Sequence, residues 1–245
     1  MKEVIAIVSR KGGSGKTTTA QALGGILKAK GYKVLLIDLD AQRNLSQAMG
    51  ADLTRPNITN FFDGSEADEV AQCTDNGFII AGSKYLDAAD IILKSNKELQ
   101  RALDRSDIDC DYVIIDTPAS PGRLTLNALA AATSAIITLE AAPFSYDGID
   151  ELTDTIEQIK EVNKALVIRG IVITKYDGRS NAARKNLDDF RAKAKQIGTK
   201  VIEPPIRATA KVFEAQGRRQ NLNEYAPKST AAQDYAAIVE HIIKW

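Results

Sequence analysis

Short runs of apolar residues recur along the chain, and longer segments with helical spacing lie between them. The runs are rich in Ile and Val and contain few polar residues, which is typical of strands buried on both faces of a parallel sheet. The runs occupy residues 4–8, 34–37, 78–81, 112–115, 135–139, 167–173 and 200–202. They predict a mostly parallel sheet.

Apolar residues spaced three and four positions apart mark the longer segments between these runs. The predicted helices cover residues 16–30, 145–162, 181–196 and 231–243, and Gly31 closes the first of them. Strands that alternate with helices predict an α/β fold with a doubly wound, mostly parallel sheet flanked by helices. Residues 51–76 are polar and poorly periodic, so we assign no structure there. The absence of repeats and of low-complexity linkers favours a single domain over residues 1–245.

Composition narrows the class of protein further. The 245 residues are 44% apolar, enough for one large core. No apolar run approaches the roughly 18 residues of a membrane-spanning helix, and the first residues lack the basic start of a secretory signal. We therefore expect a cytoplasmic protein. Cys73 and Cys110 are far apart and have no histidine cluster beside them, which favours neither a metal site nor a disulfide framework.

The net charge is zero, but the two signs are unevenly distributed along the chain. Residues 1–159 hold 15 Lys and Arg against 23 Asp and Glu, a net charge of −8, whereas residues 160–245 hold 17 against 9, a net charge of +8. A basic C-terminal third is compatible with a polyanionic partner, and equally with solvated helix faces.

The strongest chemical signal is the stretch RKGGSGKTT, which follows the first apolar run and opens the first helix. It fills the phosphate-loop spacing Gly-x-x-x-x-Gly-Lys-Ser/Thr, with Arg10 in place of the first glycine. Backbone N–H groups and a helix N-terminus at this position can surround a phosphate. We expect Lys16 to bridge the β- and γ-phosphates and the Thr17 hydroxyl to ligate Mg²⁺. The expected nucleotide contacts are Gly12, Gly13, Ser14, Gly15, Lys16, Thr17 and Thr18.

Carboxylates follow two of the other predicted strands. Asp38 and Asp40 end the second run and point to the same face of a strand, and Asp116 ends the run that begins at residue 112. An acid at the end of a buried strand is the Walker B arrangement, which can hold Mg²⁺ through a bound water. Asp38 and Asp40 have a second interpretation, as caps of the following helix.

The pattern Lys-Gly-Gly-x-Gly-Lys-Thr-Thr resembles the deviant phosphate loop of the ParA/MinD group of ATPases, in which the first lysine, here Lys11, is the signature. Residues 38–44 resemble the family segment D-x-D-P-Q-x-N, with Ala41 in place of proline, and residues 124–129 resemble the ParA and Soj segment LTxNAL. The resemblance implies that ATP and Mg²⁺ are bound and that two monomers face each other with ATP between them. It also implies that Lys11 reaches the nucleotide of the partner, that Asp40 positions the attacking water, and that Asp38 supports the Mg²⁺ shell. The alternative for Lys11 is a side chain in solvent.

The resemblance also suggests where the base lies. The segment ITKYDGR contains Lys175 at the strand end where related enzymes keep a base-recognition loop, and Pro205 would lie against the base or at the dimer edge. Asp177 resembles the last residue of the guanine-reading NKxD motif, but Thr174 stands where that motif has asparagine. The family binds adenine, so we expect ATP.

ParA and Soj proteins bind nonspecific double-stranded DNA as ATP dimers and are released when a ParB-like centromere-binding partner stimulates hydrolysis. The chain has no helix-turn-helix extension before its first strand, so it resembles the short ParA type, and a nucleoid-associated protein is implied. Basic residues in the positive third could follow DNA phosphates without reading sequence, although each one taken alone is also a plain surface charge. The residues expected to bind DNA are Arg184, Lys185, Arg207, Lys211, Arg218 and Arg219.

Three other functions remain open at this point. A MinD-like membrane ATPase would need a basic amphipathic C-terminal helix, whereas residues 232–245 contain one lysine and predict a helix packed on the sheet. A metabolic ligase or an iron–sulfur reductase could use the same fold, but Cys73 and Cys110 do not match a bridging cluster. ATP could also act as an assembly switch without turnover, against which Asp40 argues.

Overall fold

The structure is a computed structural model and describes residues 3–120, 122–142 and 148–243. These residues form one seven-stranded sheet with the strand order β3-β4-β2-β5-β1-β6-β7. All neighbouring strands are parallel except β3, which pairs antiparallel with β4 at one edge. The strands are β1 (Glu3–Val8), β2 (Val34–Asp38), β3 (Ala71–Thr74), β4 (Gly77–Ile80), β5 (Tyr112–Asp116), β6 (Ser134–Glu140) and β7 (Val167–Thr174).

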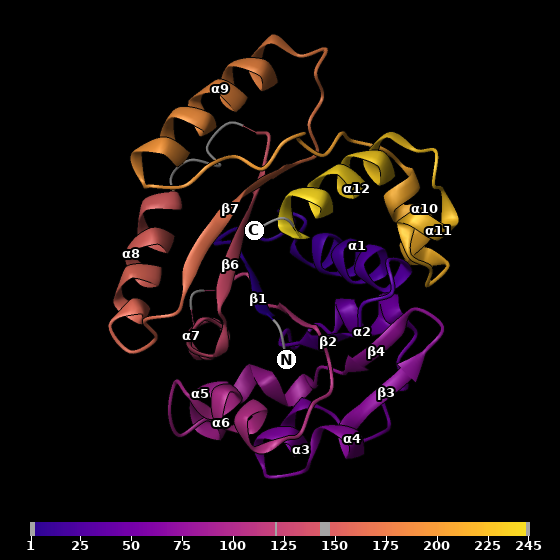
Figure 1. Cartoon of the computed structure of the whole chain (residues 1–245), viewed down its shortest axis with the longest axis vertical. Coiled ribbons are helices and arrows are strands. Elements are labelled where there is room, and N and C mark those ends of the chain that lie inside the picture. The colour runs from indigo at the N-terminus through magenta and orange to yellow at the C-terminus, as the bar shows by residue number, and fades with distance from the viewer. Residues whose placement is uncertain (1–2, 121, 143–147, 244–245) are drawn as a thin grey trace.

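Helices cover both faces of the sheet, and the first and the last described helix lie side by side although they are far apart in sequence (Figure 1). The first half of the chain contains α1 (Lys16–Ala29), α2 (Asn44–Met49), α3 (Ile58–Phe62), α4 (Ala67–Val70), the 3₁₀-helix η1 (Lys84–Ala88), α5 (Ala89–Ile92) and α6 (Glu98–Arg105). The second half contains α7 (Arg123–Ala131), α8 (Ile149–Lys160), α9 (Asn181–Gln196), α10 (Lys211–Gly217), α11 (Leu222–Tyr225) and α12 (Thr230–Ile243).

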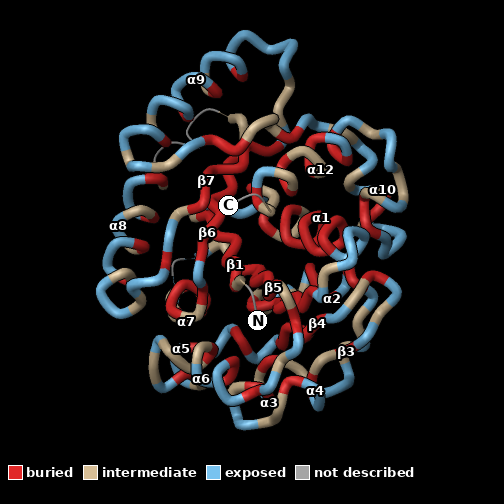
Figure 2. Tube along the Cα trace, in the orientation of Figure 1, coloured by how far each residue is buried: buried red, intermediate tan, exposed pale blue. Residues whose placement is uncertain are grey.

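Alternation along the strands divides the buried residues into two cores. On β1, Ile5 and Ile7 belong to the core covered by α1, α2, α11 and α12, whereas Val4, Ala6 and Val8 belong to the core under α3 to α9. This period of two is what a strand buried on both faces requires. Figure 2 shows the inner strands and α1 as mostly buried, the edge strand β3 as partly exposed, and the outer side of α9 as exposed. The doubly wound α/β fold predicted from the sequence is therefore confirmed.

Most predicted elements are confirmed, and the differences have physical reasons. The predicted strand at 200–202 makes only an isolated bridge, between Val201 and Ile171, because Pro204 and Pro205 follow and have no N–H groups to extend a ladder. The unassigned stretch 51–76 contains α3, α4 and β3, each of four or five residues and too short to show a period. Residues 145–147 of the predicted helix 145–162 lie outside the described residues, and the helix itself is α8.

The sheet topology determines where a ligand can bind. The central strand β1 lies between β5 and β6. After β1 the chain forms β2 to β5 on one side of it and then crosses to form β6 and β7 on the other side. In open α/β sheets, ligands bind outside the carboxyl ends of the strands at such a switch point. The loop after β1 begins at this point, and Asp38 and Asp116 end the neighbouring strands β2 and β5 in register with each other.

Candidate nucleotide and magnesium site

A pocket of about 870 Å³ opens at the carboxyl ends of the central strands. Three parts of the chain form it: the phosphate loop with the start of α1, the loops after β2 and β5, and the segment after β7 together with α12. Its lining residues are Gly12, Gly13, Gly15, Lys16, Thr17, Thr18, Asp40, Gln42, Asn44, Ala119, Thr174, Lys175, Ile206, Arg207, Ala208, Thr209, Ala210, Val212, Phe213, Gln216 and Tyr235.

The glycines of the phosphate loop have backbone angles that other residues rarely adopt. Gly13 has φ 75° and Gly15 has φ 87°, and a Cβ atom on Gly15 would approach Thr174 to 3.0 Å. Behind the loop, the Ser14 hydroxyl lies 3.1 Å from the Thr138 hydroxyl, and Thr174 Oγ1 donates to the Ser14 carbonyl at 2.9 Å. Threonines from β6 and β7 therefore hold the loop in place for the helix that starts at Lys16.

Lys16 and Thr17 meet the Walker B carboxylate at the bottom of the pocket. Thr17 Oγ1 donates to Asp116 Oδ2 at 2.7 Å, while the buried Asp116 Oδ1 has no hydrogen-bond partner among the described residues. Burial lowers the pKa of Lys16, although Asp116 and Asp40 oppose that shift. Burial also raises the pKa of Asp116 well above its usual range, and the neighbouring Asp38 raises it further.

The residues that meet here fit a magnesium ion. A hydroxyl and a carboxylate with one buried, unpartnered oxygen are the hard oxygen ligands that Mg²⁺ prefers. No group of three or more His, Cys, Asp or Glu residues within the described ranges could hold a metal alone. Such a sparse donor set suits Mg²⁺ that is shared with phosphate oxygens and water. Thr17 and Asp116 are the residues that would hold it.

Asp38 ends β2 and Asp40 lies two residues further on, yet the two carboxylates occupy different environments. Both oxygens of the fully buried Asp38 accept hydrogen bonds, Oδ1 from the Asp40 N–H and Oδ2 from the Ser46 N–H and hydroxyl. Burial raises the pKa of Asp38 to about 6. Asp40 is half-buried, accepts from the Gln42 N–H at 2.9 Å, and lines the pocket. Asp38 therefore braces the loop and the start of α2, the capping interpretation, while Asp40 faces the ligand space.

Lys11 differs from every other lysine of the candidate site. Its side chain is exposed and does not line the pocket formed by its own chain, and its N–H donates to Ser9 Oγ at 3.3 Å. Gly12, the next residue, is the first residue of the loop that lines the pocket.

The opposite end of the pocket is apolar and comes from the last third of the chain. Ile206, Val212 and Phe213 line it, and Phe213 is 74% exposed. Lys175 has φ 54°, lines the pocket and lies 3.5 Å from Glu140. Pro205, expected at the base, is not a lining residue, whereas its neighbour Ile206 is.

Two hydrogen bonds that no sequence motif predicts tie this end of the pocket to α1. Gln216 Nε2 donates to Thr18 Oγ1 at 3.1 Å, and the Tyr235 hydroxyl lies 3.1 Å from Thr19 Oγ1. Neither Gln216 nor Tyr235 belongs to a short motif. Gln42 and Asn44, by contrast, stand inside the D-x-D-P-Q-x-N segment and could have been named from it.

The basic residues expected to bind DNA separate into two groups. Arg184 and Lys185 are exposed near the start of α9, whereas the others lie before, on or just after α10, an element apart from α9 in Figure 1. Arg218 lies 5.4 Å from the Tyr225 ring, Lys211 pairs with Glu214 at 2.7 Å, and Arg219 is exposed with φ 54°. Arg207 pairs with Asp234.

The glycine-rich loop between a central strand and a helix, with a buried acid at the end of a neighbouring strand, defines a phosphate-loop nucleotide-binding α/β protein. Comparison with known proteins gives the family. The family described as an AAA domain matches residues 2–168. Soj of Bacillus subtilis, the sporulation initiation inhibitor protein, is 31% identical over 252 residues, which cover 99% of this chain and 98% of the relative. The chromosome partitioning protein ParA of Caulobacter vibrioides (strain NA1000 / CB15N) is 32% identical, with 98% and 93% covered. The chain belongs to the ParA/Soj family.

Solved structures agree with this fold. Cobyrinic acid a,c-diamide synthase of Mycobacterium smegmatis, with a bound ATP analogue and magnesium, has a TM-score of 0.87 and 30% identity, covering 100% of this chain and 95% of that one. Apo McdA of Cyanothece also has a TM-score of 0.87, at 23% identity, with 99% and 100% covered. The second likeness concerns the fold alone.

Proposed function

We propose that the chain is an ATPase of DNA partitioning that dimerises around ATP, binds nonspecific DNA in that state, and is released when a centromere-binding partner stimulates hydrolysis. Its place in the cell would be the nucleoid. The full-length similarity to proteins named for chromosome partitioning supports the general role. The magnesium-compatible pocket supports the use of ATP.

The observation that carries the proposal is the position of Lys11. The phosphate loop directs Lys16 and Thr17 into the pocket of its own chain, but it leaves Lys11 exposed outside that pocket. A positive charge beside a phosphate site but outside it is available to the nucleotide of a second subunit. Supplied in trans, such a charge stabilises the transition state and makes hydrolysis conditional on dimerisation.

The proposed reaction is hydrolysis of the bond between the β–γ bridging oxygen and the γ-phosphorus. Lys16 binds the β- and γ-phosphate oxygens, and the apolar end of the pocket binds the base. Asp40 orients the attacking water, whose oxygen bonds to the γ-phosphorus as the bridging oxygen leaves on ADP. Magnesium, when bound, neutralises charge on the phosphates. Lys11 of the partner subunit approaches the same oxygens.

DNA binding would use the exposed basic residues of the last third of the chain. Arg184 and Lys185 form one group, and Arg218 and Arg219 form the other. Contacts of this kind follow phosphates without reading bases and weaken as salt rises. A dimer would present each group twice, so that DNA affinity rises when ATP brings two subunits together.

A membrane role of the MinD type is the nearest alternative. The apolar residues of α12, among them Tyr235, Ile238 and Ile242, are buried against α1 and the sheet. Within the described ranges, no helix has the length and apolar character needed to cross a bilayer. A lipid-binding helix needs an exposed apolar face, which α12 does not offer between residues 230 and 243.

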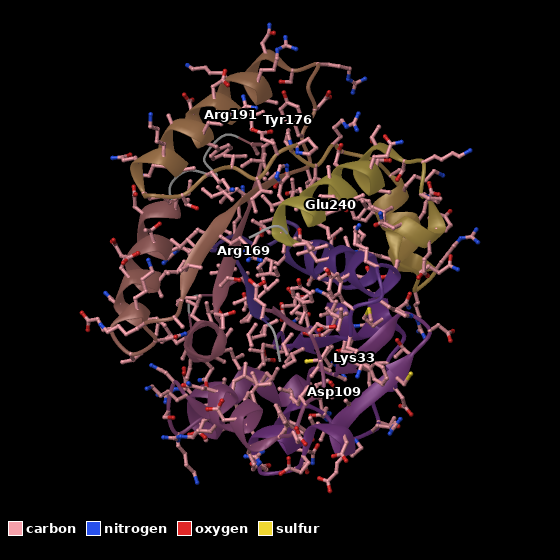
Figure 3. The ribbon with its side chains drawn as sticks, viewed as in Figure 1. Lys33, Asp109, Arg169, Tyr176, Arg191 and Glu240 are labelled. Carbon is pink, nitrogen blue, oxygen red and sulfur yellow. The ribbon has the colours of Figure 1, made fainter. Side chains whose placement is uncertain are left out.

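A small-molecule ligase is the other alternative, because one similar structure is that of an amide-forming synthase. Such an enzyme needs its second substrate next to the γ-phosphate. A second pocket, of about 650 Å³, contains Lys33 and Asp109, which precede β2 and β5 and pair with each other (Figure 3). It therefore opens at the amino ends of the strands, opposite the phosphate loop, and a ligand in it could not reach ATP.

The experiment that tests the proposal measures binding to nonspecific duplex DNA with ATP, with ADP and without nucleotide, each at two salt concentrations, together with phosphate release. Binding that requires ATP and weakens with salt is the expected result. Phosphate release without DNA binding in any nucleotide state would refute the partitioning role. Binding to lipid vesicles would then be measured to test the membrane alternative.

A further inference from the structure

Arg207 has a backbone fixed at the edge of the nucleotide pocket. The Ile206 carbonyl accepts from the Tyr176 N–H at 2.9 Å, and the Ala208 N–H donates to the Tyr176 carbonyl at 3.0 Å, so the residues on both sides of Arg207 are held by the end of β7. Figure 3 labels Tyr176 in this region. Arg207 and its neighbours Ile206, Ala208 and Thr209 all line the pocket. The pocket end in question is the apolar one, away from the phosphate loop.

A buried carboxylate holds the guanidinium group. Arg207 Nε donates to Asp234 Oδ2 at 2.9 Å and Nη2 donates to Asp234 Oδ1 at 2.7 Å, a bidentate pair, and the Arg207 backbone N–H also donates to Oδ2 at 2.9 Å. The Asp234 side chain is 4% exposed and that of Arg207 is 47% exposed. Among the described residues, none forms a hydrogen bond with Nη1. Two N–H groups, both on Nη1, are therefore left without a partner within the described part of the chain, in a residue that lines the pocket.

The pairing changes the kind of acceptor that Arg207 suits. A carboxylate at 2.7 Å neutralises most of the guanidinium charge, so its long-range attraction for DNA phosphate is weak. The planar fork nevertheless holds the two free N–H groups of Nη1 in a fixed orientation. A neutral acceptor, such as a ribose hydroxyl or a purine ring nitrogen, is the better match.

We propose that Arg207 binds the nucleoside end of ATP and not DNA, and that Asp234 is the residue that positions it. This rests on the proposed function only in that the chain binds ATP. Asp234 lies on α12 next to Tyr235, whose hydroxyl contacts Thr19 of α1. The last helix would thus align Arg207 with the helix that follows the phosphate loop.

Calorimetric titration of Mg-ATP and of Mg-ADP into Arg207→Ala and Arg207→Lys tests the proposal. Both variants should lose affinity by about 10- to 100-fold, the effect of one hydrogen bond from a charged donor. The loss should be equal for ATP and ADP because the contact does not involve the γ-phosphate. The lysine variant should not restore the affinity, because a single ammonium group cannot form a bidentate pair with Asp234 and also donate to the nucleotide. DNA binding at saturating ATP should equal that of the wild type.

Arg191→Ala is the matched control. Arg191 is also 47% exposed and paired with a carboxylate, that of Glu203, but it lies on α9 and does not line the pocket. Its nucleotide affinity should be unchanged. Asp234→Asn should give an intermediate loss, because an amide offers one acceptor in place of two. If Arg207→Ala folds poorly with an unpaired Asp234, the double variant Arg207→Ala with Asp234→Asn removes that charge and should show the same loss.

The opposite pattern would overturn the inference. If Arg207 contacts DNA phosphate, Arg207→Ala will weaken DNA binding at saturating ATP, Arg207→Lys will largely restore it, and nucleotide affinity will stay within twofold of the wild type in both. Failure of the proposed function looks different. A wild-type chain that binds ATP but not DNA refutes the partitioning role and leaves the calorimetric result to decide on Arg207.

Discussion

The two ends of the nucleotide pocket are built in different ways. At the phosphate end, one short stretch from Gly12 to Thr18, apart from Ser14, supplies most of the lining, and Asp40, Gln42 and Asn44 join it from the segment after β2. At the nucleoside end, the lining comes from residues 206–216 and from Tyr235 on α12. The first end depends on backbone shape over a few residues. The second depends on packing between distant segments, so it can vary in sequence without a change of fold.

Lys16→Ala should have the largest effect and tests whether the phosphate end dominates binding. Lys16 is the buried cation beside Asp116 and Asp40, and its loss leaves phosphate charge facing those carboxylates. We expect no measurable ATP binding by calorimetry and no phosphate release. Lys28→Ala is the control, because Lys28 lies in the last turn of the same helix. Wild-type ATP affinity in Lys16→Ala would refute the assignment of the loop.

Lys11→Ala should abolish most turnover while ATP binding to the monomer persists, because Lys11 does not line its own pocket. The loss should approach the roughly 1,000-fold effect of a cation supplied in trans. Mixing this variant with Asp40→Ala distinguishes action in trans from action in cis. In trans, one site of each mixed dimer is complete, so about a quarter of wild-type phosphate release should return. A mixture as inactive as its components would place Lys11 in its own site.

Asp40→Ala should slow hydrolysis by about 100-fold, the usual contribution of a group that positions or deprotonates water. ATP affinity should change little, since Asp40 lies beside the phosphate site and repels its charge. The measurement is phosphate release together with dimer formation in ATP by light scattering. Asp63→Ala, an exposed aspartate on the same part of the chain, should behave as wild type. Unaltered turnover in Asp40→Ala would assign the role to another residue.

The double variant Arg218→Glu with Arg219→Glu should have the smallest effect of the four changes. It tests whether the outer surface of the nucleoside end of the pocket binds DNA. These exposed arginines follow α10, whose inner side lines the pocket through Val212 and Gln216. We expect DNA affinity to fall by about tenfold at moderate salt, with ATP affinity unchanged. Lys160→Glu with Lys164→Glu gives the same change of net charge away from α10. An equal loss of DNA affinity in that control would show that the effect comes from the net charge of the protein and not from contacts made by Arg218 and Arg219.

The sequence was a good guide to the phosphate end and a poor one to the nucleoside end. The predicted residues that line the pocket there are Gly12, Gly13, Gly15, Lys16, Thr17, Thr18 and Asp40, and Asp116 accepts from Thr17, whereas Ser14 lies behind the loop. Each could be named from the sequence because it stands in a short motif next to a strongly periodic strand. The strands themselves could be predicted because both of their faces are buried, which makes their sequences continuous apolar runs. Asp38 was predicted as a site residue, but its role was not determined. Its carboxylate accepts hydrogen bonds from Ser46 and so holds the start of α2, and sequence spacing could not distinguish that role from support of a magnesium ion.

The remaining residues depend on contacts that a linear pattern does not carry. Gln216 meets Thr18 across 198 positions of sequence, and Tyr235 meets Thr19 across 216. Arg207 had the appearance of a free surface charge until its carboxylate partner was found 27 positions away. The sequence shows that a residue is positively charged. It does not show which carboxylate pairs with that residue, or how much of the positive charge remains to attract a ligand.

The packing of α12 on α1 also constrains how the protein is made. The phosphate loop and α1 leave the ribosome early, but the residues that cover α1 and complete the pocket are synthesised some 200 positions later. A nascent chain that ends before residue 230 carries an intact phosphate motif on a helix whose buried face is still bare. Such a chain contains every lining residue of the pocket except Tyr235, but it lacks the helix that packs on α1. Nucleotide affinity should therefore appear as one of the last properties acquired during synthesis, so that partly made molecules do not compete with finished ones for ATP.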